Sequence, residues 1–257
     1  MVVKFWKSAL LEALPWCRHG VTLRTAGVSA PPFSSLNGGL HVGDDPDAVR
    51  ENRRRTARAL GADSNDMVCA AQVHGSRTAV VTARDRGRGA SEFEGAIAGA
   101  DALVTADSDV LLTLFFADCV PLLLCDVRLR VVGVVHAGWR GAVAGVAENA
   151  VAAMVTGFGS RTADIVAAIG PGIGPCCFAV GEEVAEQFPA AAVRRTGAQC
   201  TVDLPRFLRD RLAAVGVSPD HIETCGDCTS CRTDRYFSHR RENGVTGRIA
   251  ALIGIRA

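Results

Sequence analysis

The 257-residue sequence lacks a charge imbalance, a long apolar run and a low-complexity linker, and each absence excludes a class of protein. Its 28 basic and 27 acidic residues are mixed along the chain, so we expect neither nucleic acid nor membrane as its partner. No window approaches the 18 apolar residues of a membrane span, and Lys7 and Glu12 interrupt any secretory apolar segment. These features predict a cytoplasmic protein, a monomer or weak homo-oligomer, that acts on a small molecule.

Histidines are also few, with six in the chain, and none forms a His-x-His pair. A multicopper oxidase needs a mononuclear and a trinuclear copper site, and therefore many imidazoles, usually in such pairs. The sequence argues against a four-electron oxidase for this reason. The ten cysteines are expected to be thiols or metal ligands, because a chain of this length buries a full core without disulfides.

The apolar patterns predict strands and helices that intermix along the whole chain. Strands are expected at 67–73, 77–81, 100–105, 110–116, 121–126, 130–135, 164–169 and 249–255. Helices are expected at 47–60, from 140 to about 154, at 182–188 and at 205–215. The order is not a regular strand–helix alternation, which disfavours a doubly wound fold and favours one domain over residues 1–257 with a buried sheet covered by helices.

Two histidines and one cysteine stand where side chains from different strands converge. His74 and His136 each follow a predicted strand, and Cys119 lies at the break between two apolar runs. Two imidazoles and a thiolate are good zinc ligands, and three protein ligands leave a fourth position for water or substrate. The ligands are 45 and 17 residues apart, unlike a local metal motif, so satisfied histidines and a buried thiol are the alternative.

The sequence around these residues contains eight short phrases in a fixed order. They include Gln72-Val73-His74-Gly75 and Ala117-Asp118-Cys119-Val120-Pro121. The other phrases lie at 37–46, 49–53, 100–105, 135–141, 169–181 and 237–241 with 246–248. Together, over about residues 24–255, they resemble the YfiH-like family, also called the peptidoglycan editing factor or multicopper polyphenol oxidase-like family.

The resemblance implies an α/β (α+β) fold, a single-domain four-layer sandwich with two mixed sheets between helices. It also implies a zinc ion bound by His74, Cys119 and His136, a ligand set that accepts copper as well. Family members are described as enzymes that catalyse phosphorolysis of adenosine, inosine and methylthioadenosine and deamination of adenosine. Others are described as copper-dependent polyphenol oxidases or as hydrolases that edit cell-wall precursors of the UDP-muramoyl-serine type.

Further polar residues in the matching phrases are candidates for substrate contacts. Arg53 is a candidate for contact with phosphate or the leaving group, although it belongs to a basic helix whose charges are equally explained by solvation. Asn37 and Gln72 can donate and accept substrate hydrogen bonds, or act in turns. Arg140 is expected either to orient substrate or to pack around Trp139.

A different class of enzyme is a cysteine hydrolase with Cys119 as nucleophile and His136 as base. The family's fold is shared with deamidating bacterial toxins that work in this way. Cys119 cannot be a nucleophile and a metal ligand in the same step, so the two hypotheses exclude each other.

Cysteines near the C-terminus raise the question of a second metal. Cys225, Cys228 and Cys231 have C-x-x-C-x-x-C spacing, which suits zinc or part of an iron–sulfur cluster. The family phrase accounts for Cys228 and Cys231 but not for Cys225, and no fourth cysteine follows. The adjacent Cys176 and Cys177 are interpreted as buried thiols.

Overall fold

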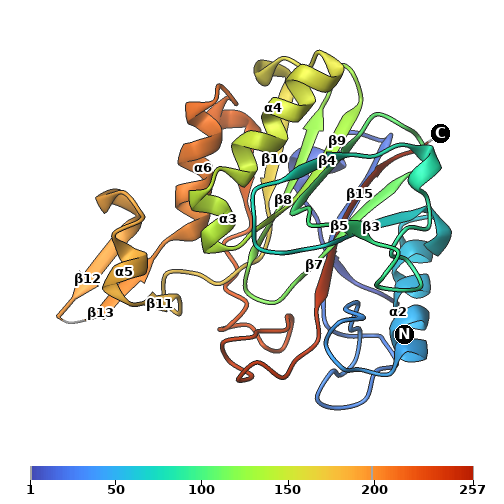
Figure 1. Ribbon diagram of the computed structural model, residues 1–257, viewed down its shortest axis with the longest axis horizontal. Helices are drawn as coiled ribbons and strands as arrows, with labels where there is room; N and C mark the ends of the chain where they lie inside the picture. Colours follow the sequence, from blue (N-terminus) through green and yellow to red (C-terminus); the bar gives the residue numbers. More distant parts are fainter. Residues whose placement is uncertain (1, 198, 257) are drawn as a thin grey trace.

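Two large β-sheets packed face to face form the centre of the protein (Figure 1). The computed structural model describes residues 2–197 and 199–256. Among these residues the strands form two six-stranded sheets and one three-stranded sheet. Both large sheets contain parallel and antiparallel neighbours: β10 pairs in parallel with β14 and antiparallel with β8, for example.

The strand order places residues from both ends of the sequence in the first sheet. Its order is β1 (Phe5–Trp6), β2 (Cys17–Thr22), β15 (Ile249–Ile255), β7 (Leu111–Phe116), β3 (Met67–Ala71) and β5 (Ile97–Ala98). The second sheet runs β14 (Ile222–Thr224), β10 (Ile165–Ile169), β8 (Val120–Asp126), β9 (Val131–Ala137), β6 (Ala102–Thr105) and β4 (Thr78–Val80). The small sheet runs β11 (Ala179–Val180), β13 (Gln199–Val202) and β12 (Val193–Thr196).

Helices are fewer than strands in the described part of the chain. They are α1 (Ala9–Glu12), α2 (Pro46–Ala59), α3 (Trp139–Val143), α4 (Val146–Phe158), α5 (Glu182–Ala185) and α6 (Leu204–Ala214). Single 3-10 turns are η1 (Ser64–Asp66), η2 (Ala83–Asp85), η3 (Thr162–Asp164), η4 (Ala190–Ala192) and η5 (Pro219–His221). None of the helices in residues 2–197 and 199–256 has the length and apolar character needed to span a membrane.

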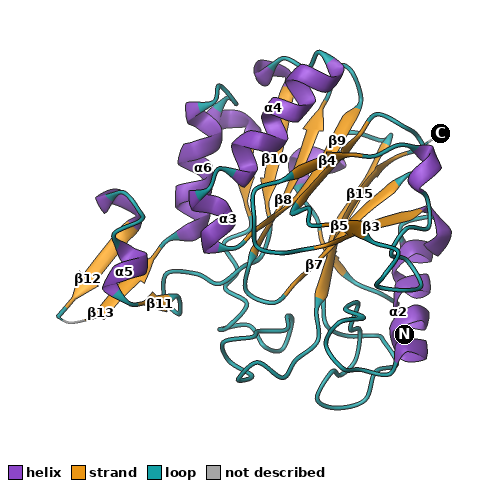
Figure 2. Ribbon diagram, in the orientation of Figure 1, coloured by secondary structure: helices purple, strands orange, loops and turns teal. Residues whose placement is uncertain are grey.

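Alternation of side chains along the strands divides the core into layers. In β8, Leu122 and Leu124 face α4 and α6, whereas Leu123 faces the first sheet. On the far side of the first sheet, Ala57 of α2 and Leu60, which directly follows this helix, pack against β3, β7 and β15. The order helix, sheet, sheet, helix confirms the four-layer α/β sandwich implied by the sequence resemblance (Figure 2).

Helix and strand boundaries differ from the predicted ones where the backbone changes direction. Gly145, with φ +84°, divides the helix expected from 140 to 154 into α3 and α4. The helix expected at 182–188 is the single turn α5. The hairpin of β12 and β13, which stands away from the main body in Figure 1, was not predicted because β12 is largely exposed and has no apolar alternation.

The inter-sheet layer is where we expect large-to-small substitutions to be most costly. Leu123→Ala removes a fully buried side chain between the sheets, and we expect it to lower the free energy of unfolding by about 2–5 kcal/mol. Val127→Ala, at a side chain that is 38% exposed just after β8, is the matched control and should change it by less than about 0.5 kcal/mol. Urea denaturation measures both, and equal losses would contradict the assignment of layers.

Candidate functional site

A cavity of about 440 Å³ opens at one end of the two sheets, where β3 and β7 end and β8 begins. Its size lies within the range typical of small-molecule sites. The wall includes the aromatic rings of Phe93, Phe115, Trp139 and Phe178 and the cationic side chains of Arg240 and Arg248. The cavity therefore offers flat apolar surfaces together with positive charge.

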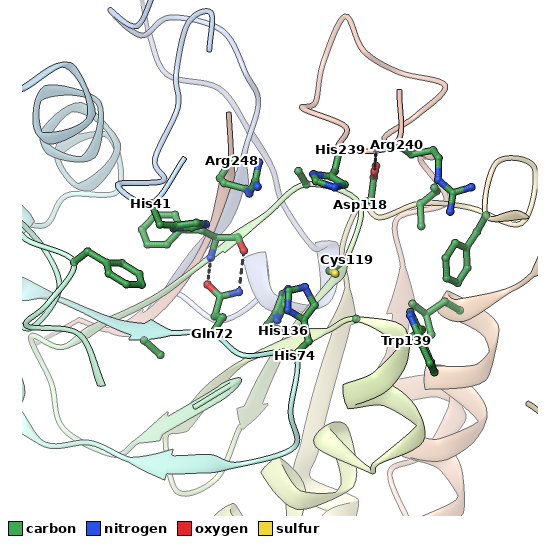
Figure 3. Close-up of a pocket in the computed structure, with 18 residues that line it drawn as sticks. His41, Gln72, His74, Asp118, Cys119, His136, Trp139, His239, Arg240 and Arg248 are labelled. Carbon is green, nitrogen blue, oxygen red and sulfur yellow. Dashed lines mark hydrogen bonds between the residues drawn. The ribbon is translucent and has the colours of Figure 1, made fainter. Parts of the chain in front are cut away.

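The cavity floor brings together His74, Cys119 and His136 (Figure 3). Their nitrogen and sulfur donor atoms all lie within 4.8 Å of one another, and the two imidazole centroids are 4.9 Å apart. His74 follows β3 as expected. His136, predicted just past a strand, lies within β9 opposite Pro121 of β8, because β9 continues to Ala137.

The buried carboxylate of Asp101 contacts the His136 imidazole and the backbone of the loop that carries His74, and the sequence alone did not predict this role. It accepts the N–H groups of Val73, His74 and Gly75 at 3.2, 3.0 and 2.7 Å. It also lies 2.8 Å from Nδ1 of His136. With Nδ1 directed at a carboxylate, the other ring nitrogen of His136 is left as the donor atom toward the cavity. The same contacts stabilise His74 in its left-handed backbone conformation, φ +59°.

Charges and hydrogen bonds within this cluster shift the pKa values of Cys119 and His136 in opposite directions. Burial raises the pKa of the Cys119 thiol, but the positive charge of His136 and hydrogen bonds from both imidazoles outweigh it and lower that pKa to about 6. Burial lowers the pKa of His136, but the charges of Cys119 and Asp101 outweigh it and raise the pKa to about 9. The lowered pKa favours the thiolate form of Cys119 at neutral pH.

Two glycines permit this close arrangement. A Cβ atom on Gly138 would lie 3.0 Å from both the Cys119 sulfur and His74 Cδ2. A Cβ atom on Gly141, in α3, would lie 2.6 Å from the carbonyl oxygen of Gly75. Since real Cβ contacts are longer, any side chain at these positions would displace the His74 loop or the thiol.

Of the two amide side chains predicted to contact substrate, Gln72 lies in the cavity wall and Asn37 does not. Gln72 lines the cavity, but its side chain is occupied by two hydrogen bonds of 2.9 Å with the main chain of Phe115. Asn37 is fully buried outside the cavity lining, and it bonds Asp44, Gly39 and the backbone N–H of Arg248. Among the described residues Asn37 lies outside the cavity lining and positions a loop, which corresponds to the turn role that the sequence left open.

Neither of the two predicted arginines lines the cavity formed by the described residues. Arg53 is 3% exposed and donates to the carbonyl oxygens of Gly38, Gly89 and Ala90 at 2.7, 2.5 and 2.9 Å. This guanidinium is enclosed between α2 and the first sheet, which favours a structural role over the predicted contact with phosphate. Arg140 is exposed and stacks on Trp139 at 4.3 Å, the packing alternative.

Arg248 takes the position in the cavity that we had expected for Arg53. Of its guanidinium nitrogens, only Nη1 donates to the described residues, at 2.9 Å to the carbonyl oxygen of Thr246 and 3.0 Å to that of Gly247. Arg248 belongs to a sequence motif that matches the family. However, an arginine that follows a glycine carries no sequence signal that separates a cavity residue from a surface residue. His41, packed 5.6 Å from the ring of Phe93, was missed for the same reason.

Comparison with known proteins assigns the chain to a family. A family profile described as multi-copper polyphenol oxidoreductase laccase matches residues 18–256. The chain belongs to this YfiH-like family. The curated relative purine nucleoside phosphorylase YlmD of Geobacillus stearothermophilus is 43% identical over 245 residues, 92% of this chain and 89% of that protein.

Solved structures of the YfiH-like family share the whole fold. The crystal structure of YlmD from Geobacillus stearothermophilus superposes with a TM-score of 0.93 at 41% identity, over 98% of this chain and 99% of that one. The crystal structure of the hypothetical protein YfiH from Bacillus licheniformis gives 0.90 at 38% identity, over 93% of each chain.

The pKa of Cys119 can be measured through its alkylation. In this YfiH-like protein, after dialysis against a chelator, we expect the iodoacetamide reaction at Cys119 to rise through about pH 6, because the thiolate is the nucleophile. Asp101→Asn removes a charge that raises the pKa of His136, so the Cys119 midpoint should move to higher pH. Peptide mass spectrometry follows both.

Cys225, whose pKa is raised by burial to about 11, is the internal control in the same samples and should react only at high pH. A midpoint near 9 for Cys119, unchanged by Asp101→Asn, would contradict the charge arrangement of the site.

Proposed function

We propose that this protein is a zinc-dependent enzyme that cleaves purine nucleosides by phosphorolysis and also deaminates adenosine. One observation carries the proposal: two imidazoles and a thiolate converge on the floor of a cavity with aromatic and cationic walls. The relatives named purine nucleoside phosphorylase, such as YlmD, supply the choice of reaction.

The ligand chemistry of His74, Cys119 and His136 fits a divalent metal. The lowered pKa of Cys119 favours its thiolate form, and the Asp101 contact holds His136 in a defined orientation, as second partners of metal-ligating histidines do. Three protein ligands leave an open position, which is typical of catalytic rather than structural zinc. When bound there, zinc supplies a Lewis acid that attracts and polarises an oxyanion or a hydroxyl group.

The cavity walls provide side chains that can bind the phosphate and the purine in phosphorolysis. In this reaction the bond between ribose C1′ and the purine breaks, a phosphate oxygen bonds to C1′, and the purine leaves with a proton. Arg248 can bind phosphate oxygens through its unused donors, since guanidinium groups match oxyanions. Phe115 and Trp139 give flat apolar faces against which a purine can stack.

Copper oxidase chemistry is disfavoured by the donor groups. The described residues contain two groups of three or more metal-ligating side chains, and neither has more than two histidines. A trinuclear copper centre requires more imidazoles than this.

A cysteine hydrolase is the second candidate, and one observation favours it. Cys119, His136 and Asp101 form a chain of thiolate, imidazolium and carboxylate, the arrangement of a nucleophile, a base and its orienting group. Metal content decides between the two, because Cys119 cannot serve both roles in one step.

Purified protein should release free base from adenosine and inosine only when phosphate is added, and ammonia from adenosine. We expect zinc bound at the triplet and at least a 100-fold loss of activity in His74→Ala, since losing even an outer-shell partner of a metal ligand costs up to about 100-fold. His221→Ala, in the distant turn η5, is the matched control and should retain activity.

Cleavage of a UDP-muramoyl-serine precursor without any nucleoside reaction would replace the nucleoside proposal by a cell-wall editing hydrolase. Metal-free protein that is active and is inactivated by alkylation of Cys119 would replace it by the cysteine hydrolase.

A pair of arginine variants separates substrate binding from folding. Arg248→Met should raise the KM for phosphate by about tenfold, about 1.4 kcal/mol of binding. It should lower stability less than Arg53→Met does, because Arg248 is only half-buried and donates to two carbonyl groups. Arg53→Met leaves three buried carbonyl groups without donors, so it should lower the free energy of unfolding by about 1–3 kcal/mol. Steady-state kinetics and urea denaturation test this, and the reverse pattern would restore Arg53 as the phosphate contact.

A further inference from the structure

A second group of thiols lies outside the cavity and has no part in the proposed reaction. The four-cysteine cluster consists of Cys176, Cys177, Cys228 and Cys231. Its sulfur atoms all lie within 4.8 Å of one another, although the two pairs are about fifty residues apart in the sequence. Cys225, which the sequence spacing had suggested as a ligand, does not belong to the cluster.

The sheet topology explains why the two pairs meet. Strands β10 and β14 are parallel neighbours, so the loops that follow them leave the same end of the second sheet. Cys176 and Cys177 lie on the first loop, Cys228 and Cys231 on the second. A bridge between Gly172 and Cys228, with Thr229 N–H donating to Gly172 at 3.0 Å, holds the loops together.

Distances between the sulfur atoms fit a tetrahedral metal and not a disulfide. The Cys231 sulfur lies 3.6 Å from that of Cys176 and 3.5 Å from that of Cys177. A bonded pair would be about 2.05 Å apart. Four thiolates around zinc, each at about 2.3 Å, lie about 3.8 Å from one another, close to the spacing seen here.

Local backbone geometry supports thiolate ligands. The N–H of Gly174 donates to the Cys228 sulfur at 3.2 Å, and the N–H of Cys231 to the Cys228 carbonyl at 3.2 Å. Gly174 is required for this approach, because a Cβ atom there would lie 3.2 Å from Cβ of Cys228. The pair Cys176 and Cys177 and the pair Cys228 and Cys231 therefore each lie in a tight turn, and the four sulfur atoms converge.

Positive charge beside the cluster offsets the charge that four thiolates would carry. Arg240 donates to the carbonyl oxygens of Cys177 and Ala179, at 3.4 and 3.0 Å. Arg241 donates to the carbonyl of Ser230 at 3.0 Å. Two thiolates in excess of the charge of Zn²⁺ are balanced by these two guanidinium groups.

We propose that the four-cysteine cluster binds one zinc ion, separate from the cavity. Soft thiolate ligands in a tetrahedral set select zinc, and four protein ligands fill its coordination, which is the form of a structural site. Cys176 and Cys177 were expected to be buried thiols. This is wrong for Cys176, which is exposed, whereas Cys177 is half-buried.

The zinc ion would join the two loops that support the cavity wall. On the first loop, Ile173 and Phe178 line the cavity. On the second, the Thr229 hydroxyl donates to Asp118 at 2.7 Å, next to Cys119. The site thus stabilises the wall without contacting the substrate.

The test counts metal in the full chain purified anaerobically from zinc-supplemented cells. Elemental analysis should find one zinc fewer per chain in the double variant Cys176→Ser with Cys231→Ser than in the unaltered protein. Both side chains are exposed, so this variant should fold. Cys225→Ser, on the same loop but outside the cluster, is the matched control and should lose none.

Cobalt in place of zinc distinguishes the two sites by their thiolate ligands. Four of five thiolates belong to the cluster, so the double variant should lose about four fifths of the thiolate-to-cobalt absorbance and Cys119→Ser about one fifth. If the cavity held no metal, Cys119→Ser would lose nothing while the double variant still would, which separates failure of the proposed function from failure of this site.

Two results would overturn the cluster as a zinc site. One is zinc content that is identical in the double variant and the unaltered protein. The other is a disulfide joining Cys231 to Cys176 or Cys177 in the anaerobically purified protein, detected by mass spectrometry of non-reduced peptides.

Discussion

The carboxylate of Asp101 is inaccessible to solvent, and four hydrogen bonds end on it. Asp101 directly precedes β6 of the second sheet, and the register of β6 against β9 places it beside His136. Its other contacts are to the loop after β3, in the first sheet. One buried charge therefore joins the two sheets at the point where the cavity forms. Because an unpaired charge there would be costly, the loop and the imidazole are held as long as the protein is folded.

Around this fixed point, two residues next to the reactive groups have left-handed backbones. His74 has φ +59° and Asp118 has φ +83°. Such conformations are unfavourable for residues other than glycine and persist where surrounding contacts compensate. For Asp118 those contacts come from Thr229 and from the N–H of Arg240 at 2.6 Å. The position of Cys119 thus depends on segments more than a hundred residues later in the chain.

The sequence was sufficient for most of the strands because their signal is local, whereas the four layers were implied only by the family resemblance. Strands such as β8 and β9 are apolar on both faces, since each face meets another layer, and they were recognised as continuous runs. The helix predicted at 47–60 is likewise α2, which has Asp45 as its N-cap and begins at Pro46.

The site was harder to predict because its residues meet only through the fold. Arg53 and Arg248 are both arginines in recognisable phrases, and only packing decides that the first is enclosed and the second faces the cavity. The four-cysteine cluster was misjudged for the same reason. Spacing along the chain suggested Cys225, whereas parallel pairing of β10 and β14 brings in Cys176 and Cys177.

The place of β15 in the first sheet has a consequence for biosynthesis. This strand is paired on both sides, with β2 and with β7, yet it is translated after every other described strand. At about 5–20 residues per second, β2 waits roughly ten to fifty seconds for its neighbour. During that interval β2 and, once it has been translated, β7 each have an unpaired edge, which can associate with other chains. A ribosome that stalls before residue 249 would leave a nascent chain with the cavity residues already made and the sheet beneath them open.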